Sequence, residues 1–360
     1  MSSGYLTHPL ASTPSQHLQI VNKLGASMSS TWRSDPRHFA TREIVALALE
    51  QYGAGDQPDV QLIGDSENLT FKVQQRGKSA PFILRLYRQG YHNKERILSE
   101  FQWMKALRVE AGVATPTVLP SLDGSLCVEI GCEGAEGRRV AAFEMLSGDE
   151  PAEANLVDSF GRLGRVTATL HSHAISWTPP QDFTRQTWDV RTMLVADNPT
   201  WGRWQNGIGM TPELLTLLSQ AEAIIIRRLE CFGTERSRFG LIHADLRLAN
   251  LLVDGDETKV IDFDDCGFSW FYYDLGAALT FIEDHPASAA IIEAWLTGYR
   301  TVRPVPREEE EELETFRLLR RLVVVAWLGS HHQTATARQY GAGYLERAAV
   351  AAHTYLKQFA

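Results

Sequence analysis

Apolar and polar positions follow two different spacings along the chain, and the spacing changes near residue 150. Before that point, short β-prone apolar runs predict strands at residues 60–63, 69–73, 82–87, 126–130 and 139–145. Polar turns that contain Gly64 and Gly77 separate the first three runs. We therefore expect an antiparallel meander there.

Two segments of this first part have helical spacing instead. Asp35 as the N-cap and Pro36 as the first helical residue predict a helix that ends at Gly53. A second helix is predicted from residue 93 to about residue 107, because its apolar residues repeat at i, i+4 and i+7. Strands and helices together predict an α+β lobe.

Beyond residue 151 helical spacing prevails, and it predicts helices at residues 156–171, 212–232, 286–302, 308–328 and 343–358. The exception is 251–263, where two β-rich runs flank the turn Asp254-Gly255-Asp256. The expected fold class is α+β, with an antiparallel sheet in an N-terminal lobe and a mainly helical C-terminal lobe. We place the lobes at residues 35–147 and 148–360, after a flexible tail at residues 1–34.

Composition narrows the class of protein. The 360 residues are 44% hydrophobic and 22% charged, as in ordinary globular proteins. The net charge of −9 disfavours nucleic acid as a partner. No apolar run approaches the ~20 residues of a membrane span and the N-terminus lacks signal-peptide features, so we expect a cytoplasmic protein without a membrane partner. We interpret the four cysteines as reduced packing residues.

The segment His243-Ala244-Asp245-Leu246-Arg247-Leu248-Ala249-Asn250 carries the strongest chemical signal, and Asp262 and Asp264 follow it after a predicted hairpin. Phosphoryl transfer from a nucleotide needs a carboxylate to accept the hydroxyl proton and oxygen ligands for Mg²⁺. The pattern His-x-Asp-x₄-Asn followed by Asp supplies one base and two metal ligands. The alternative is an acid-rich surface loop with a buried histidine.

This segment resembles the aminoglycoside phosphotransferase and choline kinase-like family, and most nearly its bacterial stress-response kinase and type II homoserine kinase branch. The resemblance implies a bilobal, protein-kinase-like fold that uses ATP and Mg²⁺. It implies that Asp245 is the catalytic base, that His243 braces the loop, and that Arg247 contacts phosphate or substrate. It further implies metal ligands at Asn250 and Asp262, an additional acid near the metal at Asp264, and a scaffold role for Asp274, which hydrogen-bonds the catalytic loop.

Two residues depart from the family's pattern. Ala244 stands where the family commonly has glycine. Arg247 stands where protein kinases have lysine and many small-molecule kinases have histidine, so a surface salt bridge is its alternative interpretation.

Candidate nucleotide contacts lie in the N-terminal lobe. Strand alternation puts Ile83 and Arg85 on one face, where Arg85 resembles the family's phosphate-anchoring cation and Glu100 of the next helix its partner. The alternative is that Arg85 is a solvated strand residue. The remaining candidates are Ser66 and Asn68, in a turn that resembles a phosphate-covering loop or is an ordinary hairpin turn, and Glu144 and Met145, which resemble the adenine-binding hinge.

Three further groups have two interpretations each. Cys266, Trp270 and Phe271 either border the acceptor site or pack in the core. His331 and His332 either contact substrate or cap a helix. The acidic run at residues 308–312 is either the first turn and exposed face of a helix or a partner site.

We therefore expect an ATP- and Mg²⁺-dependent kinase for a hydroxyl of a small molecule, whether an antibiotic, an amino alcohol, a homoserine-like amino acid or a sugar. One alternative is a serine/threonine protein kinase, which the Arg-rich helix with Trp327 favours and the lack of an Ala-Pro-Glu segment disfavours. The other is a non-catalytic nucleotide-binding regulator, which Asp245, Asn250 and Asp262 together disfavour. The oligomeric state stays open.

Overall fold

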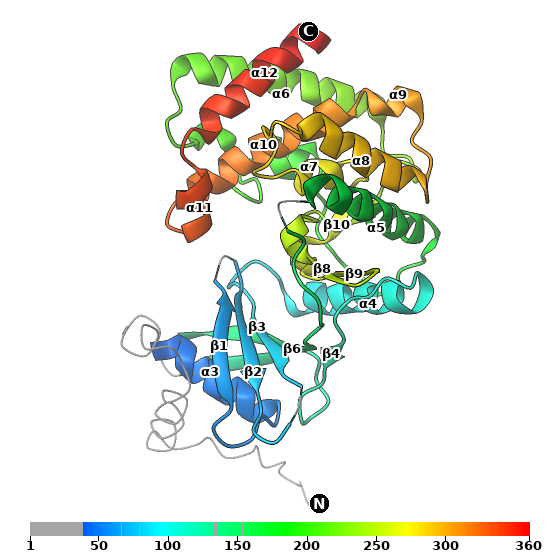
Figure 1. The fold of residues 1–360 in the computed structure, drawn as a ribbon. Coiled ribbons are helices and arrows are strands. Elements are labelled where there is room, and N and C mark those ends of the chain that lie inside the picture. The colour runs from blue at the N-terminus through cyan, green and yellow to red at the C-terminus, as the bar shows by residue number, and fades with distance from the viewer. Residues whose placement is uncertain (1–38, 66, 79, 133–134, 153–154) are drawn as a thin grey trace, which may run out of the picture. The chain divides into compact units, whose positions relative to one another are not determined.

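The computed structural model describes residues 39–65, 67–78, 80–132, 135–152 and 155–360. Two compact units divide the chain: the first holds residues up to Lys94 and Thr117–Met145, and the second holds Glu95–Pro116 and Leu146–Ala360. The predicted tail at 1–34, the helix cap at Asp35 and Pro36, and Ser66 lie outside the described residues. The elements of each unit are labelled in Figure 1.

The first unit is built on an antiparallel sheet. The predicted meander is present as β1 (Asp59–Gly64), β2 (Leu69–Gln74) and β3 (Phe82–Leu86). β6 (Ala135–Glu144) pairs with β3, and both β4 (Val118–Leu119) and β5 (Val128–Cys132) pair with β6. The sequence did not predict β4, because two residues are too few to show a period of two.

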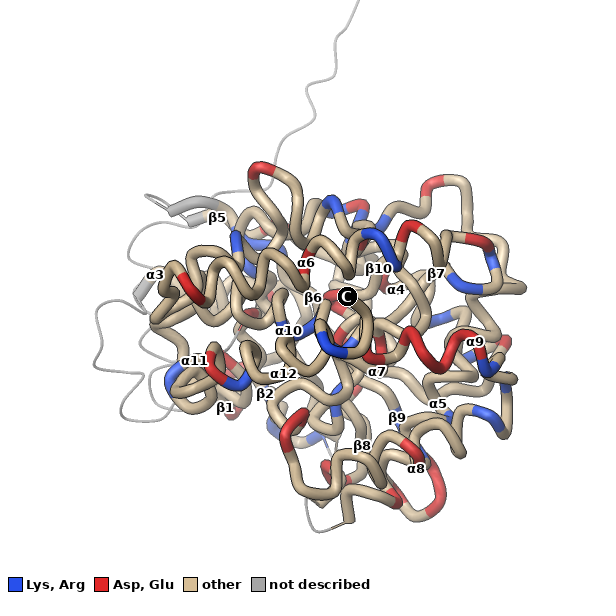
Figure 2. The backbone as a smooth tube through the Cα atoms, turned by 90° about the horizontal axis from the view of Figure 1, so that it is seen from above, with Lys and Arg blue, Asp and Glu red and all other residues tan. Residues whose placement is uncertain are grey.

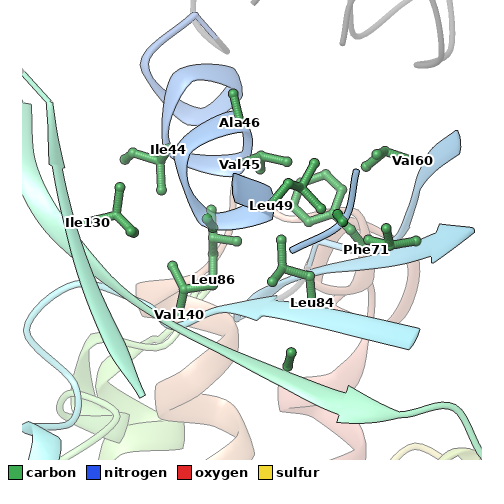
Figure 3. Packing of buried hydrophobic residues seen from close by; sticks show 14 of the residues in the cluster. Ile44, Val45, Ala46, Leu49, Val60, Phe71, Leu84, Leu86, Ile130 and Val140 are labelled. Carbon is green, nitrogen blue, oxygen red and sulfur yellow. The ribbon is translucent and has the colours of Figure 1, made fainter. Parts of the chain in front are cut away.

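The core of this unit lies between the sheet and α3 (Phe39–Gln51). Figure 3 shows Val45 and Leu49 of this helix among sheet residues that include Phe71 and Leu84. Alternation along β3 buries Phe82, Leu84 and Leu86 on this side and leaves Ile83 and Arg85 half-exposed, as predicted. Burying each large apolar side chain here stabilises the unit by about 1.5–3 kcal/mol.

α4 (Lys94–Glu110) belongs to the second unit, although the sequence grouped it with the N-terminal lobe. Its predicted apolar stripe of Ile97, Phe101 and Met104 is buried, and Trp103 and Leu107 extend the stripe. The lobe boundaries at 35–147 and 148–360 stay a prediction.

The rest of the second unit is mainly helical, with two small antiparallel ladders. β7 (Phe239–Ile242) pairs with β10 (Gly267–Trp270), and β8 (Leu251–Asp254) pairs with β9 (Glu257–Val260) as the predicted hairpin. Its further helices are α5 (Leu156–Ser176), α6 (Pro212–Phe232), α7 (Tyr273–Ala278), α8 (Ser288–Arg300), α9 (Arg307–Glu310), α10 (Leu313–Ser330), α11 (Ala335–Tyr340) and α12 (Tyr344–Phe359).

α5 and α8 pack with their backbones in near contact. A Cβ atom on Gly164 would lie 2.0 Å from the carbonyl oxygen of Trp295, and one on Gly298 would lie 1.9 Å from that of Gly161. Only glycine fits at these two positions, since real Cβ contacts are never this short. The close approach buries the rings of Trp295 and Tyr299 completely.

The predicted helix at residues 308–328 is two helices, and its acidic run turns inward. α9 ends at Glu310 and α10 begins at Leu313. Buried Glu309 accepts hydrogen bonds from Arg238 Nε and from the Tyr272 hydroxyl, each at 2.8 Å, and Glu312 accepts two from Arg228. The interpretation as a simple exposed acidic face is therefore wrong for these two residues, because arginines balance them. Figure 2 shows the acidic turn at α9.

Two sequence expectations concern membranes and thiols. No helix among the described residues is long and apolar enough to cross a membrane. Cys127 and Cys266 are buried free thiols, as predicted. Cys231 is exposed on α6, so the packing interpretation is wrong for this thiol.

Candidate active site

The loop after β7 carries His243, Ala244 and Asp245, and a buried carboxylate holds its backbone. Asp274, the second residue of α7, is fully buried. Its Oδ1 accepts a hydrogen bond from the Ala244 N–H at 2.7 Å, and its Oδ2 accepts one from the His243 N–H at 3.2 Å. Such charge-assisted bonds are about twice as strong as neutral ones, so they fix the path of the loop. The structure thus places Asp274 where the resemblance implies a scaffold residue.

Ala244 has a left-handed backbone, with φ at +68°. This conformation brings a Cβ close to a carbonyl oxygen, which costs a non-glycine residue about 1–2 kcal/mol. The family's preference for glycine at this position thereby gains a physical reason. Ala244 keeps the conformation because Asp274 binds its N–H.

His243 lies behind the loop and contacts backbone. Its side chain is fully buried. Nε2 donates to the Ile261 carbonyl at 3.1 Å, and Nδ1 accepts from the Asp245 N–H at 3.4 Å. The ring also packs on Phe263 at 4.7 Å between centroids. These contacts join the loop to the residues that follow β9, which is a bracing arrangement.

Asp245 is enclosed by donors. Arg320 Nη2 lies 2.8 Å from its Oδ1, while Arg247 Nε and Asn250 Nδ2 lie 3.2 Å and 3.1 Å from its Oδ2. Burial by itself raises the pKa of this carboxyl, but Arg247 and Arg320 outweigh burial and hold the pKa below its ordinary value. Asp245 is therefore a carboxylate at neutral pH, which is the form that accepts a proton.

Sequence reasoning missed Arg320, which reaches Asp245 from α10 across 75 residues of chain. The available signal was the arginine-rich helix with Trp327, which we took only as support for a protein kinase. Arg247, by contrast, was predicted, and its side chain contacts the candidate base directly. This contact is a partly exposed salt bridge, and the contact of Arg247 with phosphate or substrate stays a prediction.

The predicted metal ligands flank the β8–β9 hairpin. The Ile261 N–H donates to the Asn250 carbonyl at 3.0 Å, which brings Asn250 next to the residue that precedes Asp262. Asn250 Nδ2 is turned to Asp245, so Oδ1 is the atom that a cation would take. Asp262 is left-handed at φ 64°, and Asp264 is buried with its carbonyl bound by Arg185.

The described residues contain no cluster of three or more His, Cys, Asp or Glu that would hold a metal by themselves. Mg²⁺ usually takes one or two protein oxygens together with substrate phosphates, not a complete protein cage. The donor set of Asn250 and Asp262 fits that requirement. Their role, and that of Asp264, stays a prediction.

A second buried network, which the sequence did not reveal, supports Asp274 from behind. His171 of α5 lies with Nε2 3.0 Å from Asp274 Oδ2 and Nδ1 2.9 Å from the Tyr299 hydroxyl. Arg303 Nη1 donates to that hydroxyl at 2.7 Å. Burial lowers the pKa of His171 despite the carboxylate beside it, so the imidazole is neutral. The hydrogen bonds then run in one direction: Arg303 donates to Tyr299, Tyr299 donates to His171, and His171 donates to Asp274.

The candidate nucleotide residues lie mostly in the first unit. The Arg85 guanidinium lies 5.1 Å from the ring centre of Phe143. Glu100 is fully buried in α4, which belongs to the second unit, so its pairing with Arg85 stays a prediction. The Asn68 Oδ1 accepts from the Arg88 N–H at 2.8 Å, a contact that joins the β1–β2 turn to the chain after β3, and its role toward phosphate stays a prediction.

The hinge candidates end β6, and the Glu144 N–H is already bonded to the Thr117 carbonyl at 2.8 Å. Adenine contacts at this segment would therefore fall to other backbone groups of Glu144 and Met145. Both side chains are exposed.

The residues with open interpretations are now placed. Cys266, Trp270 and Phe271 are buried in the second unit, which favours the core interpretation. The Nδ1 atoms of His331 and His332 lie 3.1 Å and 3.2 Å from carbonyls of the last turn of α10. Both histidines therefore cap the helix.

Comparison with known proteins decides the family. Residues 59–313, most of the chain, match the phosphotransferase enzyme family. The chain belongs to that family. It is accordingly a small-molecule phosphotransferase of protein-kinase-like fold, with a hydroxyl group as the acceptor.

Three proteins that are similar to this phosphotransferase are named as kinases. A solved microcompartment-associated aminopropanol kinase is 42% identical, with a TM-score of 0.80 over 87% of this chain and 96% of that one. Amicoumacin kinase of Bacillus subtilis is 26% identical over 72% of this chain and 75% of its own length. A solved amicoumacin kinase in complex with AMP-PNP and Ca²⁺ shares the fold, at 20% identity and a TM-score of 0.71 over 87% and 94%.

Proposed function

We propose that this protein transfers the γ-phosphoryl group of ATP, with Mg²⁺, to the hydroxyl of a small amino alcohol. The observation that carries the proposal is the enclosed carboxylate of Asp245, held by two arginines and by Asn250 on a loop fixed from behind. A purely nucleotide-binding regulator needs no such base.

The choice of acceptor rests on the aminopropanol kinase, because its 42% identity extends over 87% of this chain. Aminopropanol carries an amine and a hydroxyl on a short carbon chain. The net charge of −9 agrees in sign with a cationic acceptor, since the field of the whole protein attracts it. The similar proteins are named as kinases of small molecules, so we propose a free small acceptor in place of a protein side chain.

The reaction assigns a defined task to Asp245. The acceptor hydroxyl gives its proton to this carboxylate while the acceptor oxygen forms a bond to the γ-phosphorus. The bond from that phosphorus to the oxygen it shares with the β-phosphate breaks, and ADP leaves with the electron pair. The Asp245 proton passes to solvent when the products depart.

Charge on the phosphates is balanced by cations in this proposal. Bound Mg²⁺ would neutralise the β- and γ-phosphates, and Asn250 and Asp262 would hold it. Arg247, one-third exposed at 32%, makes only long contacts of 3.2 Å and 3.3 Å to Asp245. Of the two arginines, Arg247 would therefore more readily leave the carboxylate of Asp245 and bind a phosphate.

The test measures ADP release from MgATP with separate pools of amino alcohols, homoserine-like amino acids, aminoglycosides, sugars and a generic protein acceptor. We expect 1-amino-2-propanol and its analogues to stimulate release. Asp245→Asn is expected to lower turnover by ~10²- to 10⁴-fold while ATP binding, followed by calorimetry, is kept. Asp254→Asn, in the exposed turn of the β8–β9 hairpin, is the control and is expected to leave turnover unchanged.

Each other outcome has a meaning. Stimulation by another small-molecule pool alone would overturn the acceptor class and keep the kinase. Stimulation by the protein alone would establish the protein kinase alternative. ATP binding without stimulated release by any pool, or turnover of Asp245→Asn within a few-fold of wild type, would refute the proposed catalysis.

A further inference from the structure

The contact between Arg320 and Asp245 joins a helix of the C-terminal region to the candidate base. Arg320 lies in α10, and its Nη2 atom is 2.8 Å from Asp245 Oδ1, the shortest of the contacts that the carboxylate makes with Arg247, Asn250 and Arg320. No motif of the catalytic loop contains this arginine. Its position depends on how α10 packs.

Other contacts hold the guanidinium of Arg320 in place. Nε donates to Thr280 Oγ1 at 3.0 Å, and Nη1 lies 3.3 Å from the Tyr273 hydroxyl and 3.4 Å from the Ala244 carbonyl. Only 11% of the side chain is exposed. A planar guanidinium with contacts on three nitrogens has little freedom to turn, so its Nη2 atom stays directed at Asp245.

The packing of α10 on α7 fixes the base of this side chain. A Cβ atom on Gly276 of α7 would lie 2.8 Å from the Phe316 carbonyl and 3.1 Å from Arg320 Cβ. α7 also carries Asp274, which binds the backbone of the catalytic loop. The two helices that pack together thus hold the same loop, one by its backbone and the other by its carboxylate.

Arg247 makes a different kind of contact with the same carboxylate. It is 32% exposed, against 11% for Arg320, and its Nε atom is 3.2 Å and 3.3 Å from the two oxygens. Arg320 is therefore the more closely held partner of Asp245, and Arg247 is the more exposed one. If Arg247 moves to a phosphate, Arg320 remains to orient and balance the carboxylate.

We propose that Arg320 is a positioning residue of the phosphotransfer reaction, which holds Oδ1 of Asp245 and so orients the carboxylate toward the acceptor hydroxyl. This inference rests on the proposed function, because it assigns Asp245 the role of base. It adds a requirement that the catalytic-loop motif does not contain.

The test compares Arg320→Gln and Arg320→Lys with the wild type, with kcat and KM measured for the acceptor that the pools identify. We expect Arg320→Gln to lower kcat by about 10- to 100-fold, because a small misplacement of a reacting group has a cost of that order. The KM for ATP should change by less than about threefold. Arg320→Lys keeps the charge but not the fork, so it should restore only part of kcat.

Arg321→Gln is the matched control. Arg321 is the next residue of α10, only 4% of its side chain is exposed, and its contact is with Asp284 and not with Asp245. Its loss tests the effect of removing a buried arginine from this helix. We expect Arg321→Gln to lower thermal stability and to leave the kcat per folded molecule and the KM for ATP as in wild type.

A second readout needs no acceptor. In crystal structures, the carboxylate of Asp245 should be turned in Arg320→Gln relative to the wild type. An unchanged orientation would overturn the inference, as would a kcat within twofold of wild type. If the wild type phosphorylates no acceptor while the carboxylate still turns, the proposed function fails and the contact itself stands.

Discussion

The imidazole of His171 donates to the carboxylate of Asp274 across 3.0 Å, and neither side chain has any exposed surface. Asp274 in turn accepts from two backbone N–H groups of the candidate catalytic loop. Three donors on one buried carboxylate satisfy it well, which offsets much of the cost of burying its charge. The conformation of the loop therefore depends on α5 as well as on α7.

The first prediction concerns pH. Burial lowers the pKa of His171, so the unfolded chain binds a proton near pH 6.5 that the folded chain does not bind. Stability is therefore lost as the pH falls below about 6.5, by up to about 1.4 kcal/mol per pH unit for this one group. Urea unfolding at pH 7.5 and pH 5.5 measures the loss. His173, whose pKa burial also lowers, adds to it.

His171→Asn should lower the free energy of unfolding at pH 7.5 and reduce the loss between the two pH values. His353→Asn, at an exposed position of α12, is the control and should preserve the wild-type difference. An equal loss in His171→Asn and in the control would show that His171 does not carry this pH dependence.

The second prediction concerns the left-handed backbone of Ala244. Ala244→Gly should raise the free energy of unfolding by about 0.5–1 kcal/mol, because relief of strain exceeds the added entropy of the unfolded chain. Chemical denaturation measures this gain, and turnover should stay within about twofold. Ala221→Gly, inside α6, should have the opposite sign and cost about 1 kcal/mol. A loss of stability in Ala244→Gly would contradict the strain argument.

The third prediction separates two glutamates of the acidic run. Glu309→Gln should lower the free energy of unfolding by about 1–3 kcal/mol, because partly buried Arg238 and buried Tyr272 lose the charged acceptor of their hydrogen bonds. Glu308→Gln, on the exposed side of α9, should change it by less than about 0.5 kcal/mol. Thermal unfolding of both variants is the measurement. Equal effects would mean that the inward contacts of Glu309 contribute nothing.

The fourth prediction tests the metal assignment. Asp262→Asn keeps a residue that tolerates the left-handed backbone and removes the charge that would face the cation. We expect the Mg²⁺ concentration needed for tight ATP binding to rise by about tenfold or more. ATP binding in EDTA should stay as in wild type. An unchanged Mg²⁺ titration would remove Asp262 from the metal site.

Strong periodicity made much of the fold predictable. The helix predicted at residues 212–232 coincides with α6, whose start carries the Thr211 cap and Pro212. The β8–β9 hairpin was equally clear from its turn residues. The break between α9 and α10 could not be predicted, because the apolar residues on both sides keep the same helical spacing. Glu309 nevertheless turns inward to Arg238.

The sequence predicted some residues of the candidate site and missed others. Asp245, Asn250 and Asp262 lie within a short stretch of chain, so their spacing is enough to predict them as candidates. Arg320 reaches the loop from α10, and His171 of α5 reaches Asp274 of α7, and no local pattern indicates a contact across 75 or 103 residues. The left-handed backbone of Ala244 could not be predicted either. Asp274 stabilises its positive φ, and an alanine in the sequence gives no sign of that conformation.

The two glycines between α5 and α8 place a constraint on how this sequence can vary. Gly164 and Gly298 let the helices touch, and that contact sets where Tyr299 meets His171. Any side chain at either glycine would force the helices apart and withdraw support from a loop that neither glycine contacts. In a saturation mutagenesis screen scored by phosphotransferase turnover, these two positions should therefore accept no substitute, as strictly as Asp245 itself.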